Sequence, residues 1–170
     1  FDEARNLYLA EKLEKAGVHV VYGVSGYKTH TKIALVVRRE RGDFKFYAHI
    51  GTGNYNSQTA KLYTDLGLFT CRTEVTSEVI QIFNYLTGLS LNKNYQKFLV
   101  SPINMRERFI SLIRHEVKNK QQGKPAGIIA KMNSLEDHEI CEELYKASQQ
   151  NVPIYLIVRG FCILCPAVMD

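Results

Sequence analysis

The sequence lacks any long hydrophobic run. No stretch of about 18 consecutive apolar residues occurs, which predicts that the chain has no membrane-spanning helix. The first residues, FDEAR, contain neither an initiator methionine nor the pattern of a signal peptide. The last residues, Pro166–Asp170, directly follow a predicted strand. We therefore expect this sequence to be an internal segment of a longer protein.

Cysteine is also scarce. Only four cysteines are present, and only Cys162 and Cys165 have the spacing of a metal-binding or redox pair. No second pair accompanies them, and the histidines other than His30 are scattered. A zinc site or a redox pair is therefore disfavoured, and no metal ligand is assigned. Reduced thiols favour a cytoplasmic location, with peripheral membrane association of the intact protein as an alternative.

Two common phosphate-binding patterns are absent. The segment Gly51–Asn56 (GTGNYN) has no third glycine at the spacing of a dinucleotide-binding loop, and no Walker A sequence occurs. A P-loop mechanism is therefore excluded. The segment is still a small-residue turn whose backbone and Asn54 amide could hydrogen-bond an anion. A plain hairpin or bulge would have the same pattern.

The composition is that of a folded protein with an excess of basic residues. Hydrophobic residues make up 45% of the 170 residues and charged residues 23%, which argues against disorder. The net charge of +5, with a pI near 9.0, favours an anionic partner such as a nucleotide, polyphosphate or nucleic acid. Lysines on solvated helices would give the same charge, so charge alone leaves the function open.

Hydrophobic periodicity predicts alternating helices and strands. Helices are expected at residues 4–16, 77–86, 104–121 and 135–149, with a short one within 57–63. Strands are expected at residues 18–22, 29–37, 44–50, 66–71, 126–132 and 154–158. The last two strands and the helix between them would form one βαβ crossover. The pattern therefore predicts an α/β fold.

A domain boundary is predicted where the polar segment QQGKP, residues 121–125, interrupts this pattern. Residues 1–122 would form most of one α/β domain. Residues 123–170 would form the start of a second, similar domain. The segments 28–37 and 154–160 share too little identity to prove an internal repeat.

The strongest candidate for chemistry is Lys28–Lys32 (KTHTK), which precedes the apolar run Ile33–Val37. Because side chains alternate along a strand, His30 and Lys32 are predicted to lie on the same face. An imidazole can form a phosphoramidate or transfer a proton, and an ammonium group can hold phosphate oxygens. An isolated strand histidine is more often structural, but Lys32 and the nearby glycine turn favour phosphate chemistry.

Two further side chains could contact a phosphorylated ligand. Tyr63 could stack on a purine or donate to a phosphate, although with ten tyrosines in the chain a single one is more often a packing residue. Arg159 ends a predicted buried strand, and ligands of open α/β sheets bind beyond the carboxyl ends of the strands. Its guanidinium could bind phosphate in a bidentate manner, or it could be an ordinary surface group.

A non-catalytic module that binds anions or nucleic acid is an alternative from another class. Basic residues recur through one part of the chain: Lys93, Lys97, Arg106, Arg108, Arg114, Lys118, Lys120 and Lys124. Few aromatic residues lie between them, so a solvated helix face explains them better than a nucleic-acid surface.

Several long stretches resemble the long-type bacterial polyphosphate kinases, the ATP-dependent polyphosphate synthases. The resemblance covers nearly the whole sequence and is carried by AGVHVVYG (16–23), KTHTK (28–32), YAHIGTGNYN (47–56), TAKLYTD (59–65), FNYLTG (83–88), IAKMNSL (129–135) and LIVRG (156–160). It implies a fold similar to phospholipase D, a mixed sheet with flanking helices. It also implies that residues 1–122 are a first catalytic domain, incomplete at its N-terminus. In that family two related α/β domains each supply a His-x-Lys-type segment to one site at their interface.

The resemblance also implies roles for individual residues. His30 would be the phosphorylated histidine, and Lys32 would be the lysine of the motif. Tyr63 and Arg159 would contact ATP. Asn54 would match the Gly-x-x-Asn that follows the histidine segment in the wider superfamily, and it is assigned to ATP binding on that basis.

The expected reaction is the reversible transfer of the terminal phosphate of ATP to a growing inorganic polyphosphate chain. The second catalytic histidine is expected beyond Asp170 and the Mg²⁺ ligands upstream of this sequence, so the segment alone should be inactive. ATP, ADP and polyphosphate are the implied partners, with a homo-oligomeric intact enzyme and no nucleic acid. A phospholipase D-like phosphodiesterase or phosphatidyltransferase is the enzymatic alternative, but Ile33–Val37 lacks the Asp that its motif places after the lysine.

Overall fold

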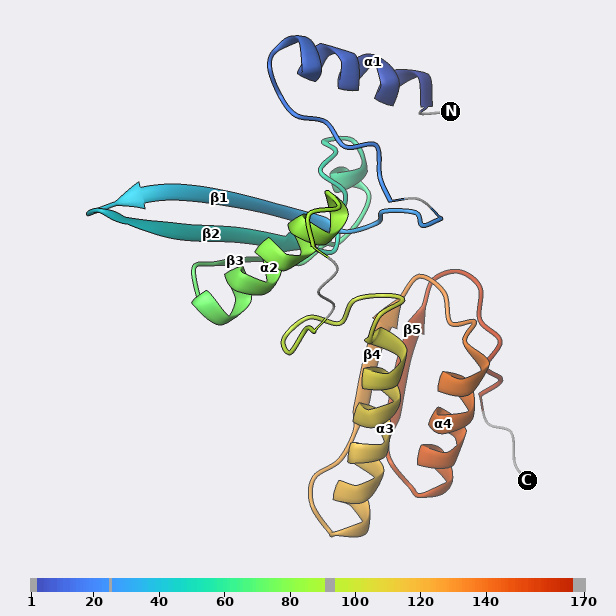
Figure 1. Cartoon of the computed structure of the whole chain (residues 1–170). Helices are drawn as coiled ribbons and strands as arrows, with labels where there is room; N and C mark the ends of the chain where they lie inside the picture. Colours follow the sequence, from blue (N-terminus) through green and yellow to red (C-terminus); the bar gives the residue numbers. More distant parts are fainter. Residues whose placement is uncertain (1–2, 25, 91–93, 167–170) are drawn as a thin grey trace. The chain divides into compact units, whose positions relative to one another are not determined.

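The computed structural model of the chain describes residues 3–24, 26–90 and 94–166. Two compact units divide the chain, Phe1–Phe98 and Leu99–Asp170 (Figure 1). Lys93, one of the basic residues considered for nucleic-acid binding, lies outside the described residues. The two ends of the chain, residues 1–2 and 167–170, also lie outside them.

An antiparallel hairpin is the centre of the first unit. β1 (Lys32–Glu40) pairs with β2 (Asp43–Gly51) along its whole length, and β3 (Gly67–Thr70) pairs with the last part of β2. The connecting residues Arg41 and Gly42 both have positive φ, 52° and 95°, which suits a tight two-residue turn. The alternating pattern of residues 44–50 predicts a hairpin strand, and β2 confirms it.

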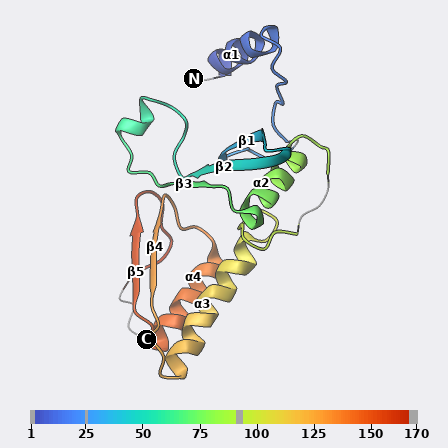
Figure 2. The ribbon, with the colours of Figure 1, turned by 90° about the vertical axis from the view of Figure 1, so that its left-hand side faces the viewer.

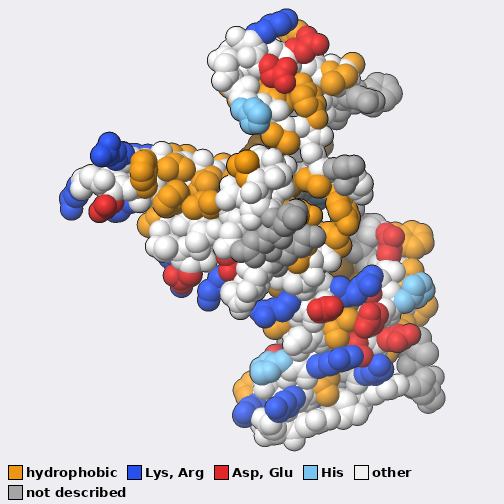
Figure 3. Space-filling view, in the orientation of Figure 1, with side chains coloured by type: hydrophobic (Ala, Val, Ile, Leu, Met, Phe, Trp, Pro, Cys, Tyr) orange, Lys and Arg blue, Asp and Glu red, His pale blue; other side chains and the backbone are white. Residues whose placement is uncertain are grey.

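One face of the hairpin is covered by α2 (Thr73–Leu86), which packs across β1 and β2. Ala48, Val79 and Ile82 are buried, so the core of this unit lies between the hairpin and α2. Phe69 lies on the opposite face and is 82% exposed. Figure 3 shows hydrophobic side chains along the hairpin and basic side chains at its tip.

The segment before the hairpin differs from the prediction. Helix α1 (Glu3–Lys15) agrees with the expected helix, but residues 18–22 form no strand. Val18 and Tyr22 are exposed, and no neighbouring strand pairs with this segment within the described ranges. β-Branched residues favour a pleated, half-buried surface, but a strand also needs a hydrogen-bonded neighbour.

The second unit is a βαβ crossover with one additional helix. β4 (Ile128–Met132) and β5 (Ile154–Val158) pair in parallel, and α4 (His138–Gln149) connects them. α3 (Met105–Gln121) packs against α4, and both helices lie on the same side of the two strands (Figure 2). The core is formed by Ile113, Leu135, Cys141, Leu144, Ala147 and Val152. The predicted α/β fold and its crossover are therefore confirmed.

The units divide at Phe98, whereas the sequence pattern places the boundary near residue 122. The difference arises because α3 packs against α4, and its Ile113 belongs to the core of the second unit. The polar segment 121–125 is therefore a turn between a helix and a strand of one unit, and not a linker between domains.

Helix starts also differ from the prediction. α4 begins at His138 because the Asp137 side chain accepts a hydrogen bond from the Ile140 backbone N–H at 3.1 Å. α2 begins at Thr73, four residues before the predicted start at residue 77, and Thr76 is buried inside the helix. The short helix expected within 57–63 is the 3₁₀ turn η1 (Thr59–Lys61). Throughout the described ranges, no helix is both long enough and apolar enough to cross a membrane.

Candidate active site

His30 lies immediately before β1, not within it. β1 starts at Lys32, so the expected strand alternation does not set the direction of the His30 side chain. The two residues are joined in another way, because Lys32 Nζ donates a hydrogen bond of 2.5 Å to the His30 carbonyl oxygen. The His30 residue is exposed, and its imidazole makes no hydrogen bond or ion pair with the described residues. An exposed imidazole and a cation thus lie within one short segment.

The charge of Lys32 is influenced by two neighbours. Partial burial and repulsion from Lys28 lower the pKa of Lys32 below its ordinary value, while the Asp65 carboxylate acts in the opposite direction. Asp65 therefore lies near enough to interact with this lysine, although the two residues are far apart in the sequence. The site combines two lysines with one carboxylate.

The glycine-rich turn after β2 is attached to the segment before β3. Thr52 N–H donates to the Leu66 carbonyl oxygen at 3.0 Å, and the Thr52 hydroxyl oxygen accepts from Leu66 N–H at 2.9 Å. These two bonds fix Thr52 beside Leu66. The position of the turn is therefore set by the segment that follows η1 and contains Leu66.

Gly53 lies directly against Asp65. A Cβ atom on Gly53 would lie only 2.0 Å from Asp65 Oδ2 and 2.2 Å from Cγ, which no side chain could tolerate without movement. The φ of Gly53 lies outside the left-handed region, so the backbone conformation does not require glycine. Glycine is needed because the Asp65 carboxylate approaches so closely. The turn and Lys32 thus share one neighbour, the Asp65 carboxylate.

His49 and Tyr55 form a second contact around this turn. His49 Nδ1 and the Tyr55 hydroxyl share a hydrogen bond of 2.6 Å, and the His49 ring lies 4.4 Å from the Phe69 ring. A Cβ on Gly67 would lie 2.6 Å from His49 Nε2. The imidazole is therefore enclosed on several sides, which contrasts with the open ring of His30.

The remaining candidates are placed as follows. Asn54 is exposed at the turn, and its carbonyl oxygen accepts from Asn56 N–H at 2.7 Å. Tyr63 follows η1 and is 49% exposed. Arg159 belongs to the second unit and follows β5, where its Nη2 donates to Asn133 Oδ1 at 2.5 Å. The structure brings His30, Lys32 and the turn into one unit, and it places Arg159 at a strand end of the other.

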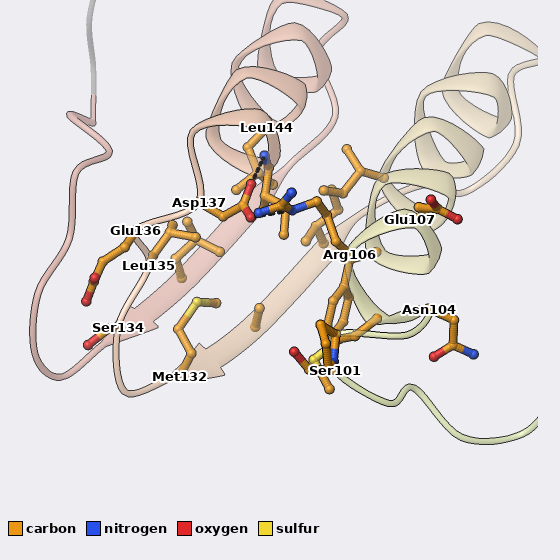
Figure 4. Close-up of a pocket in the computed structure, with 18 of the residues that line it drawn as sticks. Ser101, Asn104, Arg106, Glu107, Met132, Ser134, Leu135, Glu136, Asp137 and Leu144 are labelled. Atoms are coloured by element: carbon orange, nitrogen blue, oxygen red, sulfur yellow. Dashed lines mark hydrogen bonds and ion pairs between the residues drawn. The ribbon is translucent and has the colours of Figure 1, made fainter. Parts of the chain in front are cut away.

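A cavity of about 740 Å³ in the second unit is not part of this group. It lies between α3, β4 and the loop before α4 (Figure 4). Its wall is mainly apolar, and the ion pair between Arg106 Nε and Asp137 Oδ2, 2.6 Å, crosses it. None of the five candidate residues from the sequence lines it.

No group of three or more His, Cys, Asp or Glu side chains that could hold a metal ion occurs among the described residues. Mg²⁺ prefers an octahedron of oxygen ligands, and this chain's described residues do not supply such a set. We therefore assign no reaction step to a metal ion bound by the described residues.

Sequence reasoning misses His49, Tyr55 and Asp65. His49 and Tyr55 stand in the stretch YAHIGTGNYN, but nothing in their spacing indicates the bond between them. Asp65 stands in TAKLYTD, and its contact with Gly53 depends on how the chain returns after η1. The only sequence signal is the pair of glycines in Gly51–Gly53, which permits a close neighbour.

Comparisons with known proteins agree with the resemblance seen in the sequence. A family model described as polyphosphate kinase C-terminal domain 1 matches residues 1–92, and one described as C-terminal domain 2 matches residues 98–170. The second match begins at residue 98, next to the point after Phe98 at which the structure divides.

Individual relatives give the same result. The polyphosphate kinase of Thermosynechococcus vestitus is 54% identical over 168 residues, which cover 99% of this chain and 23% of that protein. The polyphosphate kinase of Synechocystis sp. is 57% identical over 168 residues, with the same two coverages of 99% and 23%.

A solved structure extends the comparison to the fold. The crystal structure of polyphosphate kinase from Porphyromonas gingivalis matches with a TM-score of 0.84 and 37% identity, over 99% of this chain and 28% of that one. The chain thus spans about a quarter of the length of the proteins it matches, 23% of each of the two curated relatives. Matches to both domain models, together with these relatives, show that the chain belongs to the polyphosphate kinase family.

Proposed function

We propose that this chain is a catalytic segment of a polyphosphate kinase, which transfers the terminal phosphate of ATP to inorganic polyphosphate through a phosphorylated His30. The observation that carries the proposal is the bond of 2.5 Å between Lys32 Nζ and the His30 carbonyl oxygen. It keeps a cation at the backbone of His30, whose exposed imidazole has no hydrogen-bond or ion-pair partner among the described residues. Membership of the polyphosphate kinase family supports the same reading.

The reaction would occur in two in-line steps. A neutral ring nitrogen of His30 attacks the γ-phosphorus of ATP, the bond to the bridging oxygen breaks, and ADP leaves with the electron pair. A terminal phosphate oxygen of polyphosphate then attacks the same phosphorus, and the P–N bond breaks. Lys32, with Lys28 nearby, would offset negative charge on the phosphoryl oxygens in the loose transition state.

The other candidates would hold the nucleotide. Tyr63 would stack on the purine or donate to a phosphate, Arg159 would bind phosphate oxygens, and Asn54 would donate its amide to the same anion. Mg²⁺, where it accompanies the nucleotide, would reduce the charge of the phosphates, with ligands outside the described residues. The intact enzyme would also supply a second catalytic histidine and would form a homo-oligomer, so this segment alone should be inactive.

The test is labelling of the full-length enzyme with ATP that carries a radioactive γ-phosphate. The wild type should acquire label that is lost in acid and retained in base, as expected for phosphohistidine. His30→Ala should acquire none. His19→Ala is the matched control, because His19 is exposed and has no interaction with the described residues, and it should label normally.

Two outcomes would contradict the proposal. Base-stable label that persists in His30→Ala would remove His30 from the role of nucleophile. Cleavage of phosphodiesters without any nucleotide requirement would favour the phospholipase D-like alternative over the kinase.

A further inference from the structure

Asn133 and Arg159 occupy equivalent places at the ends of two paired strands. β4 ends at Met132 and β5 ends at Val158, and these two residues are register partners in the parallel pair. Asn133 and Arg159 are the next residues of each chain segment. Parallel pairing therefore places them side by side at the carboxyl edge of the sheet.

The backbone holds this pair together beyond the last strand residues. Arg159 N–H donates to the Met132 carbonyl oxygen at 3.2 Å, and Gly160 N–H donates to the Asn133 carbonyl oxygen at 2.6 Å. Leu135 N–H donates to the Phe161 carbonyl oxygen at 2.9 Å. Three successive bonds thus continue the pairing past the sheet and fix the backbone of Asn133 relative to that of Arg159.

Gly160 permits the shortest of these bonds. A Cβ at this position would lie 2.9 Å from the Asn133 carbonyl oxygen and 3.4 Å from Ser134 Oγ. Any larger residue would push the two segments apart. The close approach at Gly160 therefore serves the alignment of Asn133 with Arg159.

The side chains are joined as well. Arg159 Nη2 donates to Asn133 Oδ1 at 2.5 Å. A guanidinium carries five N–H donors in a rigid, planar fork, so a single bond to one nitrogen restricts the orientation of the whole group. Because the acceptor is a neutral amide, the bond does not cancel the positive charge.

We propose that Asn133 is a positioning residue for nucleotide binding, which orients the Arg159 guanidinium toward the phosphates of a nucleoside triphosphate. This inference rests on the proposed function, in which Arg159 binds ATP. A carboxylate at position 133 would hold the guanidinium equally well but would compete with the phosphates for it. The amide is therefore required for its neutrality as much as for its hydrogen bond.

The test is the affinity of the full-length enzyme for a non-hydrolysable ATP analogue, measured at equilibrium. Arg159→Ala should weaken binding about tenfold to a hundredfold, as expected for loss of charged hydrogen bonds, and Asn133→Ala about threefold to tenfold. Asn133→Asp should weaken binding more than Asn133→Ala, because it adds a negative charge beside the phosphates. The KM for polyphosphate should stay within twofold of wild type in both Asn133 variants, on the order of measurement error.

The double variant decides whether Asn133 acts through Arg159. If it does, Asn133→Ala should cause no further loss of affinity in an Arg159→Ala background. An equal further loss in that background would overturn the proposal, and so would wild-type affinity in Asn133→Asp. Gln121→Ala is the control, because it removes an amide-to-amide bond of 3.3 Å to Gln150 at the other end of the unit.

Failure of the proposed function would have a different signature. If Arg159→Ala leaves ATP affinity unchanged, then Arg159 does not bind the nucleotide, and the basis of the inference is lost. If Arg159→Ala weakens binding and Asn133→Ala does not, the role of Arg159 stands and the positioning role of Asn133 is overturned.

Discussion

Two groups of charged residues, Lys32 with Asp65 in the first unit and Glu143 with its partners in the second, are held in opposite ways. In the first unit, Lys32 is partly buried and Asp65 is exposed, and Asp65 lies against Gly53 of the turn after β2. In the second unit, Glu143 is only 5% exposed. Arg114 donates to both of its carboxylate oxygens at 2.8 and 3.0 Å, and Lys146 donates at 2.9 Å.

This difference separates groups that can meet a substrate from groups that support the fold. Exposed charges are screened by water and add little stability, but they remain accessible to phosphates. A buried carboxylate must keep its partners, since an unpaired buried charge is strongly unfavourable. Substitutions around Lys32 and Asp65 should therefore change phosphoryl transfer more than stability, and those at Glu143 should do the reverse.

The largest effect is expected for Gly53→Ala. The added Cβ would meet the Asp65 carboxylate at 2.0 Å, so either the turn or the Asp65 side chain must move, which changes the surroundings of Lys32. A displacement of about 1 Å at a catalytic site can cost on the order of a hundredfold in rate. We expect a loss of that size in polyphosphate synthesis by the full-length enzyme, with little change in its melting temperature.

Gly127→Ala is the matched control for this change. A Cβ at Gly127 would lie 3.7 Å from the Pro153 carbonyl oxygen, an ordinary contact, and Gly127 has no positive φ. It should retain nearly full activity. Normal activity in Gly53→Ala would mean that the contact with Asp65 has no part in the site.

The next effect is expected for Glu143→Gln. Hydrogen bonds from Arg114, then from Lys146, lower the pKa of Glu143 from 4.5 to about 2 in spite of its burial. Because the folded pKa lies below the unfolded one, this stabilisation is complete above about pH 4.5 and is lost as pH falls toward about 2. The substitution should cost about 1–3 kcal/mol of local stability at pH 7.

Hydrogen exchange of the α4 amides in the full-length protein measures this loss. In the wild type, the local stability of α4 should fall between about pH 5 and pH 3. The size of this fall should be on the order of the loss that Glu143→Gln causes at pH 7. In Glu143→Gln the fall over the same interval should be smaller. Glu142→Gln changes the adjacent, exposed carboxylate and should leave both values near wild type. Equal pH dependence in the wild type and Glu143→Gln would show that Glu143 makes no such contribution.

Local patterns predict most of the second unit but less of the first. The βαβ crossover follows from two apolar runs and one amphipathic segment, and the structure confirms it. Residues 18–22 have an equally apolar sequence, yet they form no strand because strand formation depends on a partner elsewhere in the chain. The start of α4 lies three residues after the predicted start at residue 135, because Asp137 caps the helix.

The candidate site shows the same limit. The spacing of His30 and Lys32 draws attention to both residues, although Lys32 reaches the His30 backbone and the expected shared strand face is absent. Asp65 against Gly53 and Asn133 beside Arg159 could not be predicted. Each pair joins residues that are distant in the sequence, and their contact depends on loop geometry that no periodicity records.

A smaller effect is expected at the start of α4, where Asp137 both caps the helix and pairs with Arg106. Asp137→Ala should destabilise α4 by about 1 kcal/mol, because the Ile140 N–H loses its acceptor. Asp137→Asn keeps a capping oxygen and should cost less. Hydrogen exchange of the first-turn amides of α4 measures both. Equal losses in the two variants would mean that the ion pair, and not the cap, stabilises this helix.

The smallest effect is expected at the hairpin tip of the first unit, where Arg41 has a φ of 52°. A side chain in this left-handed region is disfavoured relative to glycine, so Arg41→Gly should stabilise the hairpin by about 0.5 kcal/mol, after allowance for the greater freedom of glycine in the unfolded chain. Arg39→Gly is the control, because Arg39 lies within β1 opposite Phe44 and glycine should weaken a strand there. Slower exchange of the β1 and β2 amides in Arg41→Gly, and faster exchange in Arg39→Gly, would show that the backbone turn sets the stability of this exposed hairpin. Faster exchange in both would instead mean that the Arg41 side chain contributes to the hairpin as much as the backbone does.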